Sequence, residues 1–225
     1  MRWVERGPEP AGVAYYSREY TQLWVRFFRE GIGGRPREHD YWRLFTRDLR
    51  ERFSNKCGYC ERQCEQVGDL SPSVDHFRPL NSFPELAYEW DNWIFSCQRC
   101  NNDKANKWLE PGYVDPCALD MAERPEEYFD YIPRTAEIVP KSGLTPEAHL
   151  KAERTIDDLG LNKIDLLASR FDHISEFIEE LYSQSSDSKK ATVVSAYMEP
   201  SQRHVGVVRM MVWQLRQAGI IQPLP

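Results

Sequence analysis

The sequence predicts a mostly helical α+β protein in which a small metal-binding module lies between N-terminal and C-terminal helices. Two Cys-x-x-Cys pairs, with 36 residues between them, enclose a central stretch that contains two short strand-like runs. On both sides of this stretch, apolar residues recur at helical spacing. We therefore expect three regions: an N-terminal helical region at 1–56, the metal module at 57–117, and a hairpin with further helices at 118–225.

The bulk composition limits the setting in which the chain works. Its 225 residues contain no apolar run long enough to span a bilayer, and the first residues lack the apolar core of a signal peptide. We therefore expect a cytoplasmic protein with no membrane partner. In a reducing compartment, six cysteines favour metal binding over disulfides. A secreted disulfide scaffold, usually shorter and richer in cysteine, is the less favoured alternative.

Charge is distributed unevenly along the chain. The net charge of −6 has the wrong sign for a protein that binds nucleic acid over its whole surface. Residues 35–56 nevertheless hold seven Arg and Lys against four Asp and Glu, whereas residues 110–181 hold seven against seventeen. The pattern indicates a local nucleic-acid footprint beside the metal module on an otherwise acidic body. The acidic helices can equally be ordinary solvated faces.

Apolar spacing and turn residues predict the elements up to the end of the module. A helix is expected over 16–30, and a second one, capped by Asp40, leads to the first cysteine pair. Within the module we expect strands at 73–77 and 93–96, followed by a helix over 98–108.

Turn and cap residues also predict the elements that follow the module. A hairpin is expected over 128–139, and a helix begins at Thr145 and ends at Gly160. Asn162 is expected to cap the next helix. Two later stretches are read as a polar, serine-rich break and a final helix, at 183–190 and 202–218.

The cysteines of the two pairs predict a closed metal site formed by Cys57, Cys60, Cys97 and Cys100. A Cys-x-x-Cys turn holds two sulfurs close enough to share one ion, and Zn²⁺ accepts four thiolates in a tetrahedron. Because four thiolates fill the tetrahedron, this Zn²⁺ is expected to be structural. A redox dithiol is the alternative, which two pairs at this spacing fit poorly. The remaining cysteines, Cys64 and Cys117, are expected to be ordinary thiols.

A second set of polar residues lies between and just after the cysteine pairs. Asp75 and His76 are adjacent in the first expected strand, and Asn101 directly follows the last cysteine. Adjacent strand residues point to opposite faces, so Asp75 and His76 act together only if the strand ends or bends there. Carboxylate and amide oxygens are hard ligands that suit Mg²⁺ or Mn²⁺. The set therefore predicts a second, open metal site.

These residues together resemble the HNH endonuclease signature, through Asp75-His76, Asn92 and Cys97-x-x-Cys100-Asn101-x-x-Lys104. The resemblance implies a ββα-metal fold, with two short strands and one helix around a single catalytic metal. It also implies that His76 is the general base, that Asp75 and Asn101 bind the metal, and that Asn92 orients His76 and the loop between the strands. Many members have histidine where this chain has Asn101, and an amide oxygen suits Zn²⁺ and Ni²⁺ less well than imidazole does.

A narrower resemblance is to the PtuB-type HNH proteins of Septu anti-phage systems and of related retrons. It rests on four motifs of the central stretch and one downstream: Cys57-Gly-Tyr-Cys60-Glu61, Val74-Asp-His-Phe-Arg-Pro79, Trp90-Asp-Asn92, Ser96-Cys-Gln-Arg-Cys-Asn-Asn102, and Thr155-Ile-Asp-Asp-Leu-Gly-Leu-Asn162 with Arg170. The resemblance implies a PtuA-like ATPase partner and, in a retron, a reverse transcriptase with its RNA/DNA product. It also gives the acidic C-terminal region a role as a docking surface.

The sequence therefore favours a metal-dependent HNH endonuclease that hydrolyses nucleic-acid phosphodiester bonds, with DNA favoured, as the effector of an anti-phage complex. The alternative is a non-catalytic zinc module that binds nucleic acid or protein, although such a module needs no Asp-His between its cysteine pairs. In a third interpretation, the protein is an HNH-derived scaffold whose active site is intact but which acts mainly by assembling a partner. Four residues are candidate phosphate contacts, with solvated surface charge as the alternative for each: Arg78, Arg99, Lys104 and Lys107.

Overall fold

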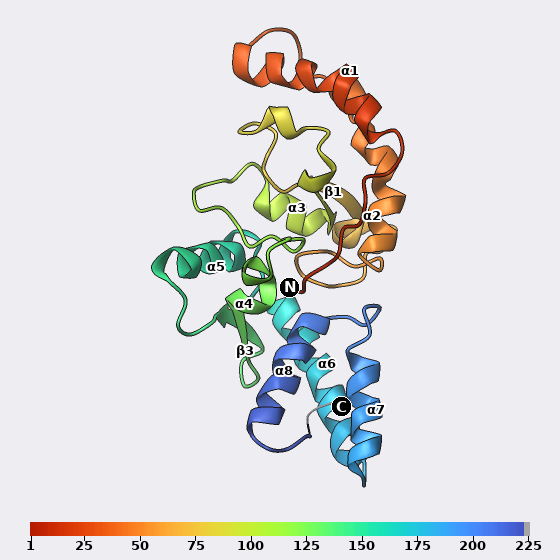
Figure 1. The fold of residues 1–225 in the computed structure, drawn as a ribbon, viewed down its shortest axis with the longest axis vertical. Coiled ribbons are helices and arrows are strands. Elements are labelled where there is room, and N and C mark those ends of the chain that lie inside the picture. Colours follow the sequence, from red (N-terminus) through yellow and green to blue (C-terminus); the bar gives the residue numbers. More distant parts are fainter. Residues whose placement is uncertain (223–225) are drawn as a thin grey trace. The chain divides into compact units, whose positions relative to one another are not determined.

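The structure is a computed structural model that describes residues 1–222. Two compact units divide the chain. One consists of residues 4–58 and 63–112, and the other of residues 1–3, 59–62 and 113 onward. Each unit combines helices with a two-stranded antiparallel sheet (Figure 1). The predicted α+β, mostly helical fold class is confirmed.

The first unit begins with a helical arm. Helix α1 (Val13–Val25) and the π-helical segment over 26–30 that continues it together cover the predicted helix at 16–30. Helix α2 (Thr46–Arg52) follows two short 3₁₀ turns. The prediction that Asp40 caps the second helix is wrong. The chain enters α2 through a 3₁₀ turn, so the Asp40 carboxylate meets no helical amide and instead pairs with Arg43 at 3.1 Å.

The arm leads to a compact module of two strands and one helix. Strand β1 (Pro72–His76) pairs antiparallel with β2 (Trp93–Cys97), and α3 (Gln98–Lys104) begins directly after β2 and contacts both strands. All five residues of β2 are buried. Both strands were predicted to within one residue at each end. The helix is shorter than predicted because Ala105 adopts a left-handed φ of 49°, which an L-residue in a continuing helix cannot have.

The second unit carries the predicted hairpin and four longer helices. Its elements are α4 (Pro125–Tyr128), β3 (Phe129–Ile132), β4 (Glu137–Pro140), α5 (Pro146–Asp158), α6 (Ile164–Ser183), α7 (Asp187–Tyr197) and α8 (Val205–Gln217). Thr145 caps α5 as predicted, with its hydroxyl accepting from the Ala148 amide at 3.3 Å. Asn162 caps nothing, because its side-chain amide instead pairs with both backbone groups of Ile138 in β4 at 2.8 and 3.0 Å.

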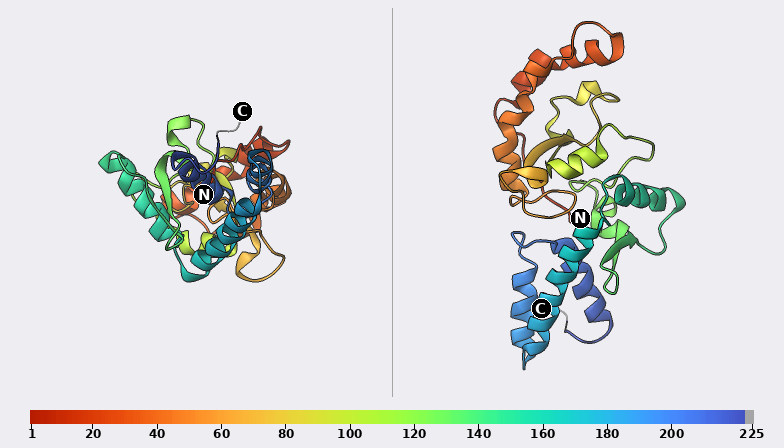
Figure 2. Two further views of the ribbon diagram at one scale, coloured as in Figure 1. Left: turned by 90° about the horizontal axis from the view of Figure 1, so that it is seen from below. Right: turned by 180° about the vertical axis from the view of Figure 1, so that it is seen from behind.

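Helix α7 begins within the stretch 183–190, for which the sequence predicts a polar break. Ser186 caps it by accepting from the Lys189 amide, so part of the serine-rich run is a helix start. The packing of α6 and α8 against α7 forms a helical group that is visible in Figure 2. The sequence prediction missed this helix because serine and aspartate are common both in loops and at the starts of helices.

The start of α8 is a close approach that admits only glycine. The Gly206 amide donates to the Glu61 carboxylate at 2.9 Å, and a Cβ at this position would lie 2.5 Å from the Met1 carbonyl oxygen. We expect Gly206→Ala to lower the free energy of unfolding by about 1–3 kcal/mol, as overpacking does. Urea denaturation measures this, with Gly34→Ala as the control, because a Cβ there meets nothing within 4 Å. Equal unfolding midpoints for the two variants would contradict the expectation.

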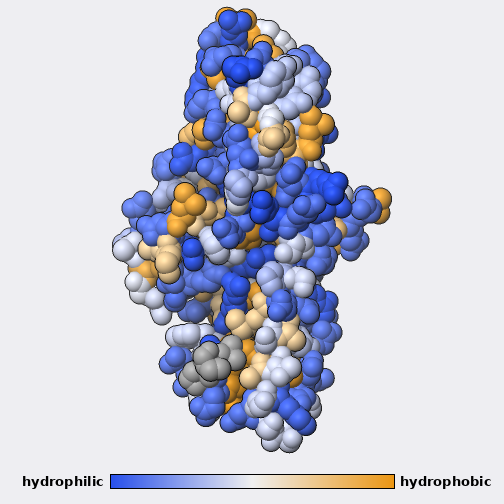
Figure 3. All heavy atoms as spheres, turned by 45° about the vertical axis from the view of Figure 1, so that its right-hand side comes forward, coloured by the Kyte–Doolittle hydropathy of each residue, from blue (hydrophilic) through white to orange (hydrophobic). Residues whose placement is uncertain are grey.

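The length and hydrophobicity of the helices bear on whether one of them could cross a membrane. Among residues 1–222, no helix combines the length and the apolar character needed to cross a bilayer. On the face drawn in Figure 3, hydrophobic residues are scattered in small groups among hydrophilic ones.

Candidate metal centre and active site

Four buried cysteine side chains converge in the ββα module. The Sγ atoms of Cys57, Cys60, Cys97 and Cys100 all lie within 4.8 Å of one another. With Zn–S bonds near 2.3 Å, tetrahedral geometry places sulfurs about 3.8 Å apart, so the donor set and the spacing fit a single ion. Within the described part of the chain, this is the only group of three or more His, Cys, Asp or Glu side chains with metal-binding spacing. The structure thus brings together all four predicted ligands.

Local packing explains why the first cysteine pair reaches the second. The Gly58 amide donates to the Phe95 carbonyl at 2.8 Å, which fixes the first turn against β2. A Cβ at Gly58 would lie 2.6 Å from the Phe53 ring and 2.9 Å from the Ile94 side chain. Glycine is therefore required for this approach. The second cysteine pair needs no glycine to reach the site, because Cys97 ends β2 and Cys100 lies in the first turn of α3.

His76, the predicted general base, is buried at the end of β1. Its ring meets the Trp42 ring edge-on at a centroid distance of 4.6 Å. Its Nε2 lies 2.8 Å from the Ala87 carbonyl oxygen, which can only accept, so Nε2 carries the hydrogen and Nδ1 keeps its lone pair. The pKa of His76 falls to about 4, because burial and, to a lesser degree, the charge of Lys104 outweigh the opposing effect of the Ala87 hydrogen bond. His76 is therefore neutral at pH 7.

Asp75, the predicted metal ligand, lies on the opposite face of β1. Strand β1 pairs regularly with β2 up to its last residue, His76, so the two side chains leave opposite faces of the strand at the point where it ends. The Asp75 carboxylate accepts from Lys104 Nζ at 3.1 and 3.0 Å, and Lys104 also donates to the His76 carbonyl at 2.7 Å. Both side chains are almost completely buried. A cation that binds Asp75 therefore has to share the carboxylate with the Lys104 ammonium group or displace it.

The two predicted asparagines join parts of the module. Buried Asn92 accepts from the Arg78 amide at 2.8 Å and donates to the carbonyls of Arg78 and Leu86 at 3.1 and 3.3 Å, which clamps the loop between the strands. Asn101, in α3, donates to the Ser73 hydroxyl of β1 at 3.1 Å. Its side-chain oxygen accepts no hydrogen bond within residues 1–222, so this oxygen remains available to a ligand.

The four candidate phosphate contacts divide by exposure. Arg78 and Lys107 are exposed, Arg99 is mostly covered and pairs with Asp103 at 3.8 Å, and Lys104 is enclosed in its pair with Asp75. The Arg78 guanidinium lies over two aromatic rings, those of Phe83 and Trp108, at 5.6 and 5.9 Å. Sequence reasoning missed this aromatic support and the Ala87 carbonyl. No local motif marks either of them.

Removing Lys104 is expected to destabilise the module strongly. In Lys104→Met the Asp75 carboxylate stays buried without its main partner, and breaking a buried pair in this way typically costs about 3–5 kcal/mol. Urea denaturation measures the loss. The matched control is Lys107→Met, on an exposed side chain three residues away, which we expect to change stability by less than about 0.5 kcal/mol. Adding Asp75→Asn to Lys104→Met should recover part of the loss; if the two single Lys variants are equally stable, the pair contributes nothing.

Comparison with protein families places this module in a known class. Residues 57–107 match the model of the HNH endonuclease family. The match covers β1, β2, α3 and all four clustered cysteines. Residues 57–107 therefore form a domain that matches the HNH endonuclease family.

The chain is also similar to individual proteins of known name. The chain is 29% identical to a Septu protein PtuB from Bacillus thuringiensis over 151 residues, 66% of this chain and 51% of that protein. It is 28% identical to a Septu protein PtuA from Bacillus mycoides (strain KBAB4) over 161 residues, 60% of this chain and 21% of that protein. A Septu protein PtuB from the same strain is 28% identical over 109 residues, which are 35% of this chain and 36% of that protein. The chain thus spans about half or less of each relative, and the predicted PtuB resemblance is confirmed.

Proposed function

We propose that this chain is a metal-dependent HNH endonuclease that hydrolyses phosphodiester bonds, with DNA as the favoured substrate. One observation carries the proposal: the match to the HNH family coincides with a ββα module that holds a neutral, oriented histidine at the end of its first strand. A neutral imidazole with one free nitrogen is the chemical requirement for a general base near pH 7.

In this proposal His76 accepts a proton from the attacking water at Nδ1. The Ala87 carbonyl fixes the tautomer from the other side of the ring, and the Trp93 indole, which donates to the same carbonyl at 3.0 Å, helps to hold that oxygen in place. Asn92 keeps the loop between the strands closed around this arrangement. General-base catalysis of this kind typically contributes about 10²–10⁴-fold in rate.

The proposal assigns the metals to two sites. The four clustered cysteines hold Zn²⁺, and their closed shell gives that ion a structural role. Asp75 and Asn101 offer hard oxygen ligands to Mg²⁺ or Mn²⁺. These ligands can bind the ion if the Lys104 ammonium group shares the Asp75 carboxylate with it or moves away. When bound, the divalent ion supplies stabilisation of negative charge on the phosphate. Arg78 and Lys107 are the exposed cations that contact substrate phosphates. Arg99 and Lys104, which are less exposed, are the further candidates for such contacts.

We further propose a biological setting for this activity. Similarity to proteins named Septu PtuB and Septu PtuA supports a cytoplasmic effector of an anti-phage defence complex with a PtuA-like ATPase as its partner. In a retron version of such a system, a reverse transcriptase and its RNA/DNA product are additional partners. The ATPase gives the cell a means of restraining a nuclease that would otherwise cut its own nucleic acid.

A non-catalytic zinc-binding module that contacts nucleic acid or protein is the second candidate function. One observation favours it: the polar groups of Asp75 and His76 are both engaged inside the module, by Lys104 and by the Ala87 carbonyl. In that case these residues hold the module together and do not act on a substrate.

A cleavage assay separates the two functions. Plasmid DNA and tRNA are incubated with the purified chain in Mg²⁺, Mn²⁺ or EDTA, with and without the partner ATPase. The nuclease predicts cleavage that EDTA stops and that added Mg²⁺ or Mn²⁺ restores without added Zn²⁺. Binding of nucleic acid without cleavage under every condition, including with the ATPase, would support the zinc module instead.

A further inference from the structure

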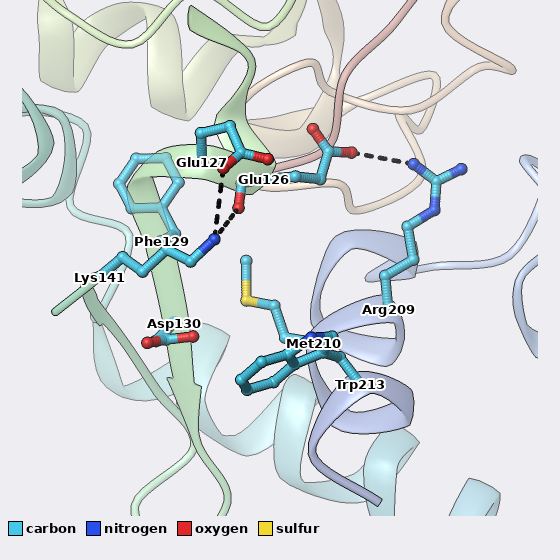
Figure 4. A pocket seen from close by; sticks show the side chains of 8 residues that line it. All are labelled: Glu126, Glu127, Phe129, Asp130, Lys141, Arg209, Met210 and Trp213. Atoms are coloured by element: carbon cyan, nitrogen blue, oxygen red, sulfur yellow. Dashed lines mark hydrogen bonds and ion pairs between the residues drawn. The ribbon is translucent and has the colours of Figure 1, made fainter. Parts of the chain in front are cut away.

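A cavity in the second unit lies outside the HNH domain. Its volume is about 270 Å³, and its walls come from α4 and the β3–β4 hairpin on one side and from α8 on the other (Figure 4). Ligand pockets for whole small molecules usually range from about 300 to 1,000 Å³. A cavity of this size therefore suits one side chain better than a nucleotide.

The cavity combines an apolar floor with an exposed indole. Phe129 and Met210 are buried, whereas the Trp213 side chain, one turn further along α8, is 56% exposed. Figure 4 shows the Trp213 ring beside the Met210 side chain at the α8 wall. Tryptophan provides the strongest aromatic face for a cation.

The cations that line the cavity already have partners. Arg209 pairs with Glu126 at 2.9 Å, and Lys141 lies 3.5 Å from the Glu127 carboxylate and 3.3 Å from the Glu126 carbonyl. Asp130 also lines the cavity, and within residues 1–222 its carboxylate has no hydrogen bond and no ion pair. The cavity thus has one uncompensated negative charge, which favours a cationic ligand and disfavours a phosphate.

We propose that this cavity binds an arginine side chain presented by a basic segment of a partner protein. A planar guanidinium group can stack on the Trp213 indole and also donate two hydrogen bonds to the Asp130 carboxylate. The remaining methylene groups of the arginine fit against the apolar floor.

Two features point to a protein segment as the source of the arginine. Ile132 follows Asp130 by two residues in β3, so its exposed side chain lies on the same face of the hairpin and offers an apolar contact to a neighbouring residue. Residues 113–225 also carry 18 Asp and Glu against 12 Lys and Arg, a net charge of −6 that complements a basic segment. The inference does not depend on the proposed nuclease activity.

The test follows the indole N–H signal of Trp213 by NMR in the ¹⁵N-labelled full chain, assigned with Trp213→Phe. The probe is the peptide Ac-Gly-Arg-Gly-NH₂, and Ac-Gly-Glu-Gly-NH₂ is its charge-reversed control. We expect a saturable shift with the arginine peptide, with a Kd on the order of 1 mM, and none with the glutamate peptide. Asp130→Asn should weaken binding about tenfold. Asp172→Asn should not, because Asp172 is an exposed carboxylate on α6 outside the cavity.

Three results would overturn the proposal. The first is no saturable shift with the arginine peptide, or an affinity that Asp130→Asn leaves unchanged. The second is binding of ethylguanidinium chloride as tight as that of Ac-Gly-Arg-Leu-NH₂, whose leucine supplies the apolar neighbour for Ile132; this would define a small-cation site and not a docking surface. The third is tighter binding of inorganic phosphate, with Asp130→Asn strengthening it, which would define an anion site.

Discussion

His76→Gln is expected to lower the rate of phosphodiester cleavage by about 10²–10⁴-fold and to leave the fold in place. The glutamine amide can donate to the Ala87 carbonyl as Nε2–H does, at 2.8 Å in the wild type, but it offers no nitrogen lone pair to accept a proton from water. Cleavage of plasmid DNA with enzyme in excess measures the rate of the chemical step. Circular dichroism and the thermal midpoint check the fold.

The choice of glutamine matters because the ring of His76 is part of the core. Alanine at position 76 would remove the proposed base as well. The ring is buried against Trp42, however, so alanine would also leave a cavity and lower stability. The matched control is His149→Gln, on a half-exposed histidine of α5. Cleavage by His76→Gln at the wild-type rate would show that His76 is not the general base.

Local patterns were sufficient to predict the elements that make the site. A short aromatic and β-branched run, Trp93-Ile94-Phe95, places β2, and a Cys-x-x-Cys turn brings its two sulfurs together wherever it occurs. Thr145 followed by proline specifies a helix start through groups only a few residues apart. These features need no knowledge of the tertiary structure, because each is determined within one short segment.

Features that depend on distant partners could not be predicted in this way. Asp40 and Asn162 are residue types that often cap helices, yet the Asn162 side chain forms hydrogen bonds with the backbone of Ile138, 24 residues earlier in the chain. Lys104 looks like a surface cation in the sequence, and only the packing of α3 on β1 shows that it is enclosed with Asp75. The acceptor of His76 is a backbone carbonyl, which no residue type can reveal. The same holds for the cavity between β3 and α8.

The pairing of Lys104 with Asp75 links the stability of the module to its proposed chemistry. In the metal-free state the ammonium group neutralises a carboxylate that would otherwise be buried without its main partner. A divalent cation with affinity for Asp75 competes with this ammonium group, so part of its binding free energy is spent on rearranging the pair. In the proposed mechanism, binding of the divalent ion therefore depends on rearranging the pair of Lys104 and Asp75.

Cys97→Ser is expected to abolish metal binding by the cysteine cluster and to prevent stable folding of the module. Cys97 is fully buried where β2 meets α3, and its sulfur is one of four that lie within 4.8 Å of one another. A structural zinc ion in zinc-finger peptides contributes about 10–16 kcal/mol, which is comparable to the total stability of about 5–15 kcal/mol that a typical domain has. Metal analysis of the purified protein and its thermal midpoint measure the effect.

Two companion variants separate loss of the ion from loss of a buried thiol. Cys64→Ser changes a buried cysteine outside the cluster, so it should keep the metal and lower the thermal midpoint only modestly. Cys97→His offers a nitrogen ligand, and because three cysteines and one histidine form a common zinc site, it should recover part of the metal content. A soluble Cys97→Ser protein with wild-type metal content and an unchanged midpoint would rule out the four-cysteine site. Similar losses in Cys97→Ser and Cys64→Ser, with no recovery in Cys97→His, would assign the effect to packing.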